Sequence, residues 1–378
     1  MKKMKCILSV AMAASFAHAA QADINVGIVA SLTGPAAALG SDTKKAVALM
    51  PATVAGEKVN YIVLDDAADP TTAVKDTQKL ITDHKVDVII GPNINPSAAA
   101  MTGVVDEAKV PMVVTTPYFP PADKRTWVFQ AVQSAELMVQ RLVDDMVEHK
   151  VRTVGFIGFA DSWGDLLLTE LQKATKNTDI RIVSEERYKR PDTSVTGQVL
   201  KVVGARPDVV FVGASGAPAV LPETELRQRG FTGTIYQSHG VTTKEFLRIG
   251  GKGVDGTFVP ASPTLVSEQL PDSIESKKVA VAFNDAYEKA NGADSRSTFA
   301  GSTWDASLLI NTAVPLALRK AKPGTAEFRQ ALRDALEQTR GVVGVNGVYN
   351  MSATDHNGLD KRGRVLVQVK DGKWAFAK

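Results

Sequence analysis

The stretch that decides the fold is Val86-Asp87-Val88-Ile89-Ile90-Gly91-Pro92-Asn93-Ile94-Asn95-Pro96-Ser97-Ala98-Ala99-Ala100-Met101. A mostly apolar run stops at Gly-Pro, and a turn rich in Asn, Pro and Ser then opens an Ala-rich segment. This order predicts a buried parallel strand, a loop and a helix. The first turn of such a helix carries unpaired N–H groups and a partial positive charge, so with Asn95 and Ser97 beside it the turn could hold a small carboxylate. The alternative is that Ser97 only caps the helix.

The same order of strand and helix recurs on both sides of this stretch. Short β-branched runs, such as residues 24–30 and 181–188, alternate with segments of helical periodicity, such as residues 134–148. Regular alternation of this kind predicts an α/β protein whose mostly parallel sheets are flanked by helices. In such sheets ligands bind beyond the carboxyl ends of the strands.

The alternation occurs twice, which predicts two lobes. One series of strands ends near Thr115, and after a Pro-rich stretch a second series opens at Val151. After residue 263 come helices without intervening strands, and these need a sheet to cover. We therefore expect a first lobe of residues 23–138 plus 262–347 and a second of residues 139–261 plus 348–378. A length of 378 residues exceeds what one hydrophobic core usually holds.

Residues 1–22 have the pattern of a cleaved secretory signal peptide. Three lysines precede an apolar stretch of residues 6–16, and small residues allow cleavage after Ala19 or Ala22. This stretch is too short to span a bilayer, so we expect an exported, periplasmic protein. Removing the three lysines lowers the net charge from +3 to zero, which gives no electrostatic basis for binding nucleic acid or an anionic membrane.

Several kinds of chemistry find little support in the sequence. The single cysteine, Cys6, lies in the signal peptide, and the four histidines after residue 22 do not form a metal-ligand pattern. The glycines of residues 251–256 match a dinucleotide-binding spacing, but they precede a predicted strand instead of following one. The acidic cluster that ends at Asp69 is explained as a loop in which Asp69 caps a helix beginning at Pro70. We expect no cofactor and no metal.

One enzymatic alternative is a serine hydrolase. Gly213-Ala214-Ser215-Gly216-Ala217 comes within one residue of a nucleophile elbow, and His239 is available as a base. The second glycine of the motif is missing and no acid is marked as the third member. Because a catalytic triad is defined by geometry, the residues alone do not establish it.

Five motifs resemble those of the branched-chain amino-acid-binding (Leu/Ile/Val-type) family of periplasmic solute-binding proteins. They are Ser31-Leu32-Thr33-Gly34-Pro35, Leu64-Asp65-Asp66 with Asp69-Pro70, Ile90-Gly91-Pro92, Val110-Pro111-Met112 and Asp161-Ser162-Trp163-Gly164. The resemblance implies two α/β lobes joined by three crossing segments, with the ligand enclosed between them by hinge closure. It also implies docking on an inner-membrane permease of an ATP-driven (ABC) transporter, no catalytic role and a monomer.

The resemblance also implies the ligand-binding residues. In the first lobe they are Leu39, Asn95, Ser97, Thr115, Thr116 and Tyr118, and in the second Trp163, Ser215 and His239. Structural alternatives are that Trp163 fills an interlobe core, that Ser215 caps a helix, that His239 makes structural hydrogen bonds, and that Tyr118 lies on the surface.

The position of His239 decides the expected ligand class. In the family an acidic residue that pairs with the ammonium group of the amino acid falls on this position. A buried ammonium needs an anionic or strongly accepting partner, and histidine is a poor one. We therefore expect a small, flat carboxylate such as a benzoate, hydroxybenzoate or phenylacetate, from the branch of the family associated with aromatic acids. The alternatives are branched-chain or other amino acids bound by the same fold, or a ligand-sensing role.

Overall fold

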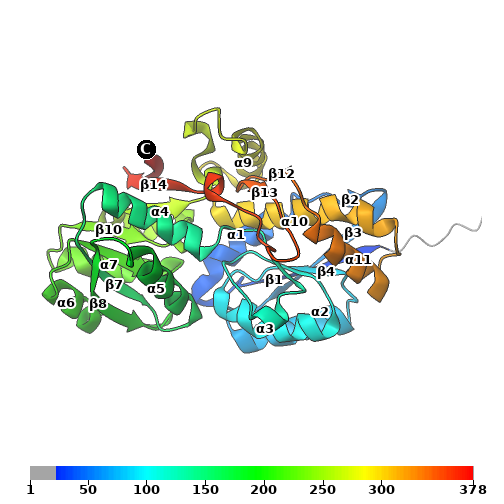
Figure 1. Cartoon of the computed structure of the whole chain (residues 1–378), viewed down its shortest axis with the longest axis horizontal. Coiled ribbons are helices and arrows are strands. Elements are labelled where there is room, and N and C mark those ends of the chain that lie inside the picture. Colours follow the sequence, from blue (N-terminus) through cyan, green and yellow to red (C-terminus); the bar gives the residue numbers. More distant parts are fainter. Residues whose placement is uncertain (1–22, 378) are drawn as a thin grey trace, which may run out of the picture.

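The computed structural model describes residues 23–377, and the predicted signal peptide lies outside this range. The chain forms two lobes side by side (Figure 1), each built on a sheet of mostly parallel strands with helices on both faces. The predicted fold class is therefore confirmed.

The sheet of the first lobe has the order β2-β3-β1-β4-β5-β6. Every pair in it is parallel except β2 with β3. Its strands are β1 (Ile24–Ala30), β2 (Thr53–Val54), β3 (Glu57–Asp65), β4 (Val88–Ile90), β5 (Met112–Val114) and β6 (Val128–Gln130).

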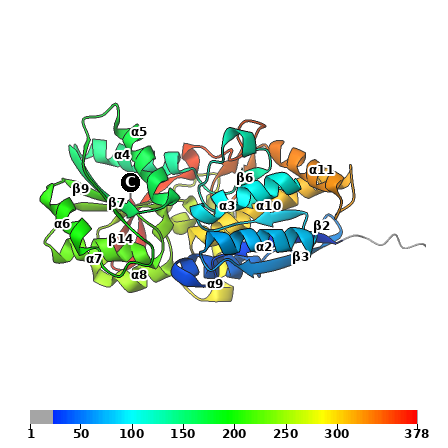
Figure 2. The same ribbon diagram turned by 90° about the horizontal axis from the view of Figure 1, so that it is seen from below.

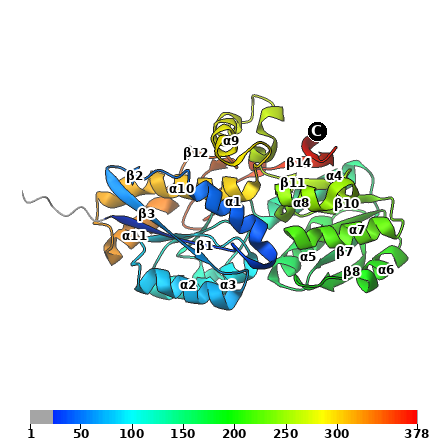
Figure 3. The ribbon, with the colours of Figure 1, turned by 180° about the vertical axis from the view of Figure 1, so that it is seen from behind.

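Helices cover both faces of this sheet, as Figure 3 shows. One face packs on α2 (Pro70–Thr82) and α3 (Asn95–Ala108), and the other on α10 (Thr298–Leu318) and α11 (Ala326–Glu337). Beside α10 lie α1 (Ala37–Val47) and α9 (Lys277–Asn291). The predicted cap of α2 is confirmed, because the Asp69 carboxylate accepts a hydrogen bond from the N–H of Thr72.

The stretch from Val86 to Met101 forms the predicted strand, loop and helix, as β4, residues 91–94 and α3. Gly91 has a φ of +99°, and a Cβ atom there would lie 2.2 Å from the carbonyl oxygen of Val29 on β1. Only glycine fits both this backbone conformation and this close approach. The turn therefore leaves the sheet at once and brings the N-terminus of α3 to the carboxyl edge of the strands.

The sheet of the second lobe has the order β15-β14-β11-β10-β9-β7-β8. Only β14 and β15 are antiparallel additions. Its strands are β7 (Thr153–Phe159), β8 (Arg181–Tyr188), β9 (Val209–Gly213), β10 (Thr234–Gln237), β11 (Phe258–Ala261), β14 (Val365–Lys370) and β15 (Lys373–Ala377).

Five helices flank this second sheet. They are α4 (Ala135–Glu148), α5 (Ser162–Thr175), α6 (Thr196–Gly204), α7 (Val220–Gln228) and α8 (Lys244–Gly250). Figure 2 shows α4 and α5 on one face and α7 and α8 on the other. The core between them is rich in Val, Leu and Phe side chains that have no contact with solvent.

Three segments join the lobes, namely residues 131–134, the connection from β11 through α9 to α10, and the connection from the hairpin β12 (Val342–Val343) and β13 (Val348–Tyr349) to β14. The predicted boundary at residue 347 falls inside this hairpin. Tyr349 packs in the first-lobe core and its hydroxyl donates to Asp305 of α10. We therefore propose that the last lobe boundary lies near residue 363.

The first and third connections are tied together by side-chain amides. Gln133 Nε2 donates to the carbonyl oxygens of Asn346 and Gly363, at 2.9 and 2.5 Å. Asn357 Nδ2 donates to the carbonyl oxygen of Val132 at 2.7 Å. These bonds satisfy buried backbone groups where the chain leaves regular structure.

A buried carboxyl group in the second lobe makes stability depend on pH. Glu223 of α7 accepts hydrogen bonds from Gln237 and Thr257, and burial raises its pKa from 4.5 to about 7. The folded state therefore binds this proton more tightly than the unfolded state, so stability falls as the pH rises from about 4.5 to about 7. The shift corresponds to about 3 kcal/mol.

We expect Glu223→Gln to remove this loss. The variant should have a higher melting temperature than the wild type at pH 8 and a similar one at pH 4.5, measured by circular dichroism. Glu148→Gln, at an exposed position of α4, is the matched control and should leave both values unchanged. If the melting temperature of E223Q differed from that of the wild type by the same amount at both pH values, this would contradict the account.

Candidate functional site

The predicted site residues lie at the facing carboxyl edges of the two sheets. Leu39, Asn95, Ser97, Thr115, Thr116, Trp163, Ser215 and His239 are all buried, with at most 8% of their surface exposed. Tyr118 is half-buried. A second-lobe threonine, Thr242, is hydrogen-bonded to Thr298 at the start of α10. The lobes are therefore in contact around these residues.

The polar side chains predicted on the first lobe bind mostly to the lobe itself. Asn95 Nδ2 donates to the carbonyl oxygen of Pro117 at 2.8 Å, and Thr115 Oγ1 donates to that of Pro92 at 3.0 Å. Ser97 Oγ donates to Asp66 at 2.9 Å. These bonds hold the turn in shape and direct one donor each of Asn95, Ser97 and Thr115 into the lobe.

The N-terminus of α3 has no side-chain cap. Its N-cap residue is Ile94, which offers no acceptor, and Ser97 lies within the first turn. The alternative that Ser97 caps this helix is therefore wrong. The N–H groups of the first turn lack a capping oxygen, which is the arrangement that binds an anionic group of a ligand.

Tyr118 lines a pocket on the first lobe. Its hydroxyl accepts a hydrogen bond from Thr102 on α3 at 3.2 Å, and its N–H donates to Gln130. Its predicted contact with the ligand stays a prediction.

Apolar side chains cover the first-lobe side of the site. Leu39 on α1 packs with Ile94 and with Phe299 on α10. A Cβ atom on Gly216 of the second lobe would lie 3.2 Å from Leu39 Cδ1, so the lobes approach closely here. Phe299 was not predicted as a site residue. The sequence around it predicts a helix but does not indicate which end of that helix faces the site.

On the second lobe Trp163 is the second residue of α5, whose N-cap is Asp161. The Asp161 carboxylate accepts from the N–H groups of Trp163 and Gly164. The indole Nε1 donates to the carbonyl oxygen of Ala214 at 3.3 Å, and the indole meets the ring of His239 edge to face at 5.3 Å. Trp163 is thus held rigidly and is part of the second-lobe core.

His239 is a buried imidazole, one ring nitrogen of which is unpaired in the described part of the chain. It follows β10, and its Nδ1 atom has no hydrogen-bond partner within residues 23–377. Burial lowers the pKa of the ring to about 4, so the ring is neutral at neutral pH. Leaving a buried polar atom unpaired costs about 1–3 kcal/mol, which points to a ligand or water as its partner.

Arg190 is the charged residue that the sequence analysis missed. Its Nε donates to Asp161 at 2.7 Å and its Nη1 to Ser215 Oγ at 3.1 Å. Its guanidinium lies 4.2 Å from the ring centre of Phe159. It follows the predicted strand at 181–188, so the rule that placed Ser215 at a carboxyl edge would also have found Arg190.

These contacts do not form the hydrolase arrangement. Ser215 Oγ accepts from Arg190, and no hydrogen bond joins Ser215 to His239 in the described chain. Within residues 23–377 no group of three or more His, Cys, Asp or Glu side chains is placed to hold a metal ion. In the same range no helix has both the length and the apolarity needed to cross a membrane.

Comparison with known proteins gives a consistent result. A family model described as "Periplasmic binding protein" matches residues 23–373. The Leu/Ile/Val-binding protein homolog 3 of Brucella melitensis is 29% identical over 340 residues, which cover 85% of this chain and 90% of the relative.

Solved structures with the same fold are also found. An extracellular ligand-binding receptor from Rhodopseudomonas palustris HaA2 is 42% identical, covers 94% of this chain and 100% of its own, and superposes with a TM-score of 0.92. A solute-binding protein of an ABC transporter from R. palustris, solved in complex with benzoate, is 20% identical. The matched region covers 94% of this chain and 95% of the R. palustris chain, with a TM-score of 0.80.

Proposed function

Because the chain belongs to the periplasmic binding protein family, we propose that it delivers a small aromatic carboxylate to an ABC uptake transporter. It is a solute-binding protein of the Leu/Ile/Val-binding type, and proteins of this family work with ABC permeases. The ligand is held between the two lobes and is a benzoate, hydroxybenzoate or phenylacetate. Export to the periplasm depends on the signal peptide in residues 1–22.

The observation that carries this proposal is the lack of a carboxylate to receive an ammonium group. The imidazole of His239 is buried and neutral. Two carboxylates contact predicted site residues, and both are engaged: Asp66 accepts from Ser31 and Ser97, and Asp161 accepts from Arg190. Within residues 23–377, an amino acid would therefore find no carboxylate at these residues that is free of hydrogen bonds to the protein.

A flat acid fits the same groups well. Arg190 keeps N–H donors beyond the two that bond to Asp161 and Ser215. These donors and the Ser215 hydroxyl can form hydrogen bonds with its carboxylate, and Trp163 can pack against its ring. The first turn of α3 and Thr116 can meet a hydroxyl at the far end of the ring. This orientation reverses the one expected from the sequence, because the Asn95 and Ser97 side chains are engaged within the first lobe.

A thermal-shift screen of the ligand-stripped mature chain tests the proposal. We expect benzoate, 4-hydroxybenzoate or phenylacetate to raise the melting temperature by several degrees, because a ligand at 100 times its Kd adds about 2.7 kcal/mol. Leucine and valine should leave it unchanged.

The second candidate is amino-acid binding by the same fold. It is favoured by the relatives named as Leu/Ile/Val-binding proteins. A shift with leucine or valine and none with any aromatic acid would replace our proposal with this one. The benzoate complex of the R. palustris protein supports only the capacity of the fold for such a ligand.

A further inference from the structure

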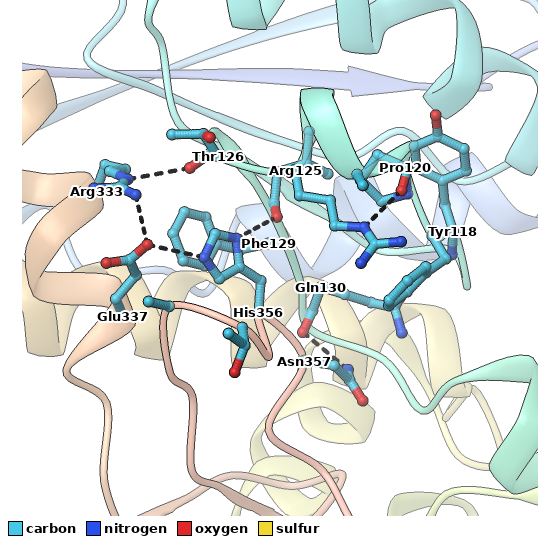
Figure 4. A pocket seen from close by; sticks show the side chains of 15 residues that line it. Tyr118, Pro120, Arg125, Thr126, Phe129, Gln130, Arg333, Glu337, His356 and Asn357 are labelled. Atoms are coloured by element: carbon cyan, nitrogen blue, oxygen red, sulfur yellow. Dashed lines mark hydrogen bonds and ion pairs between the residues drawn. The ribbon is translucent and has the colours of Figure 1, made fainter.

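A second pocket lies on the first lobe, apart from the interlobe site (Figure 4). It has a volume of about 280 Å³ and is formed by the segment that follows β5, by α11, and by the loop that leads from the hairpin to β14. Its aromatic and charged lining residues are Tyr118, Phe119, Arg125, Phe129, Arg333, Glu337 and His356.

One wall of this pocket carries an arginine without an anionic partner. Arg125 Nε donates to the carbonyl oxygen of Pro120 at 2.9 Å, and its guanidinium lies 4.1 Å from the ring centre of Phe119. No carboxylate within residues 23–377 forms an ion pair with it. Phe119 is 66% exposed, which is unusual for so large an apolar side chain.

The opposite wall combines two stacked aromatic rings with an arginine and a glutamate that neutralise each other's charge. His356 stacks on Phe129 with ring centres 4.1 Å apart and planes 11° apart. The Glu337 carboxylate accepts from Arg333 at 2.6 Å and lies 3.1 Å from His356 Nε2. Figure 4 shows this chain of side chains facing Arg125 and Tyr118 across the pocket. Because Glu337 is already paired with Arg333, it opposes an incoming anion only weakly.

We propose that this pocket is a second binding site for a planar aromatic carboxylate. The ring of the ligand lies against Phe119 and the Phe129–His356 stack, and its carboxylate pairs with Arg125. Aromatic rings favour stacked or edge-to-face contact with another ring. The Arg125 Nη atoms form no hydrogen bond with any group in residues 23–377, so a carboxylate can supply the guanidinium with a charge-assisted pair of hydrogen bonds.

This second site does not depend on lobe closure. All its lining residues lie in three segments, residues 118–130, 333–337 and 353–357. The first two segments belong to the first lobe, and the last lies where the third connection leaves that lobe. The interlobe site, in contrast, is assembled from both lobes. The second site therefore binds its ligand in open and closed states alike, whatever the interlobe ligand is.

Equilibrium dialysis of radiolabelled benzoate against the ligand-stripped chain tests this inference. We expect the wild type to bind two molecules of benzoate per chain at saturation and Arg125→Gln to bind one. The molecule lost in Arg125→Gln should be the more weakly bound of the two. Lys124→Gln removes a neighbouring exposed charge that lies outside the pocket and should still bind two. Phe119→Ala should weaken the second class at least tenfold, and because Phe119 is exposed this variant should fold.

The outcomes distinguish this site from the interlobe one. Arg190→Met should leave one bound benzoate, which a further R125Q substitution should remove. If the interlobe site does not take benzoate, the wild type binds one molecule and R125Q none, which supports the second site and excludes benzoate as the interlobe ligand. One molecule per chain with no effect of R125Q would overturn the inference.

Discussion

Replacing Arg190 with methionine is expected to weaken binding of an aromatic carboxylate roughly 100-fold, or about 3 kcal/mol. Arg190 is only 12% exposed and donates to Ser215 Oγ beside the site, so it is the cation best placed to meet the ligand. Methionine keeps much of the length of the side chain and removes its charge and donors. Isothermal titration calorimetry with the best acid from the screen measures the change.

Two further variants separate binding from folding in this experiment. Arg187→Met removes another arginine of the same region, which donates to Phe159 and pairs with Asp165, and it should leave the affinity within about twofold. Because R190M leaves Asp161 without its cationic partner, the double variant R190M/D161N should regain stability and still bind weakly. Wild-type affinity in R190M would refute the role of Arg190.

Replacing Asp305 with alanine is expected to lower the stability by about 4 kcal/mol, or the melting temperature by on the order of 10 °C. Its buried carboxylate accepts from the N–H groups of Val345 and Asn346, at 2.8 and 2.9 Å, and from the Tyr349 hydroxyl at 2.8 Å. Alanine leaves the two buried N–H groups without this acceptor, while the Tyr349 hydroxyl keeps the carbonyl oxygen of Ala131 at 3.1 Å. The hydrogen bonds that are lost hold the hairpin that leads into the third connection between the lobes.

Burial raises the pKa of Asp305 to about 7 while its three donors oppose that shift. Asp305→Asn keeps one acceptor oxygen and should fall between the wild type and D305A. Asp285→Ala, at an exposed position of α9, is the control and should melt within about 2 °C of the wild type. Scanning calorimetry measures all four proteins, and a D305A variant as stable as D285A would show that the hairpin is held by other contacts.

Much of the fold was predictable because its signals are local. The apolar run before Gly91 and the helix after it follow from a few neighbouring residues, and β1 and β8 begin and end where their β-branched runs do. The last lobe boundary that we propose, near residue 363, rests on a contact that is not local. It follows from Tyr349 reaching Asp305, a contact between residues 44 positions apart.

The site was predictable by position and less so by chemistry. The carboxyl-edge rule and the family resemblance together predicted Trp163, Ser215 and His239, and the structure brings these three side chains into one buried region. The sequence could not show that Ser97 bonds to Asp66, or that Arg190 turns back toward Ser215. Both facts depend on side-chain directions, which are set by packing between distant segments.

The account is tested most directly by calorimetric titration with 3-phenylpropanoate and with L-phenylalanine. The two ligands share the ring, the chain length and the carboxylate, and they differ in the ammonium group alone. Since His239 is neutral and Asp66 and Asp161 are already engaged, we predict that 3-phenylpropanoate binds at least 100-fold more tightly. Tighter binding of L-phenylalanine would contradict the account, because it would require an anionic partner for the ammonium group at this site.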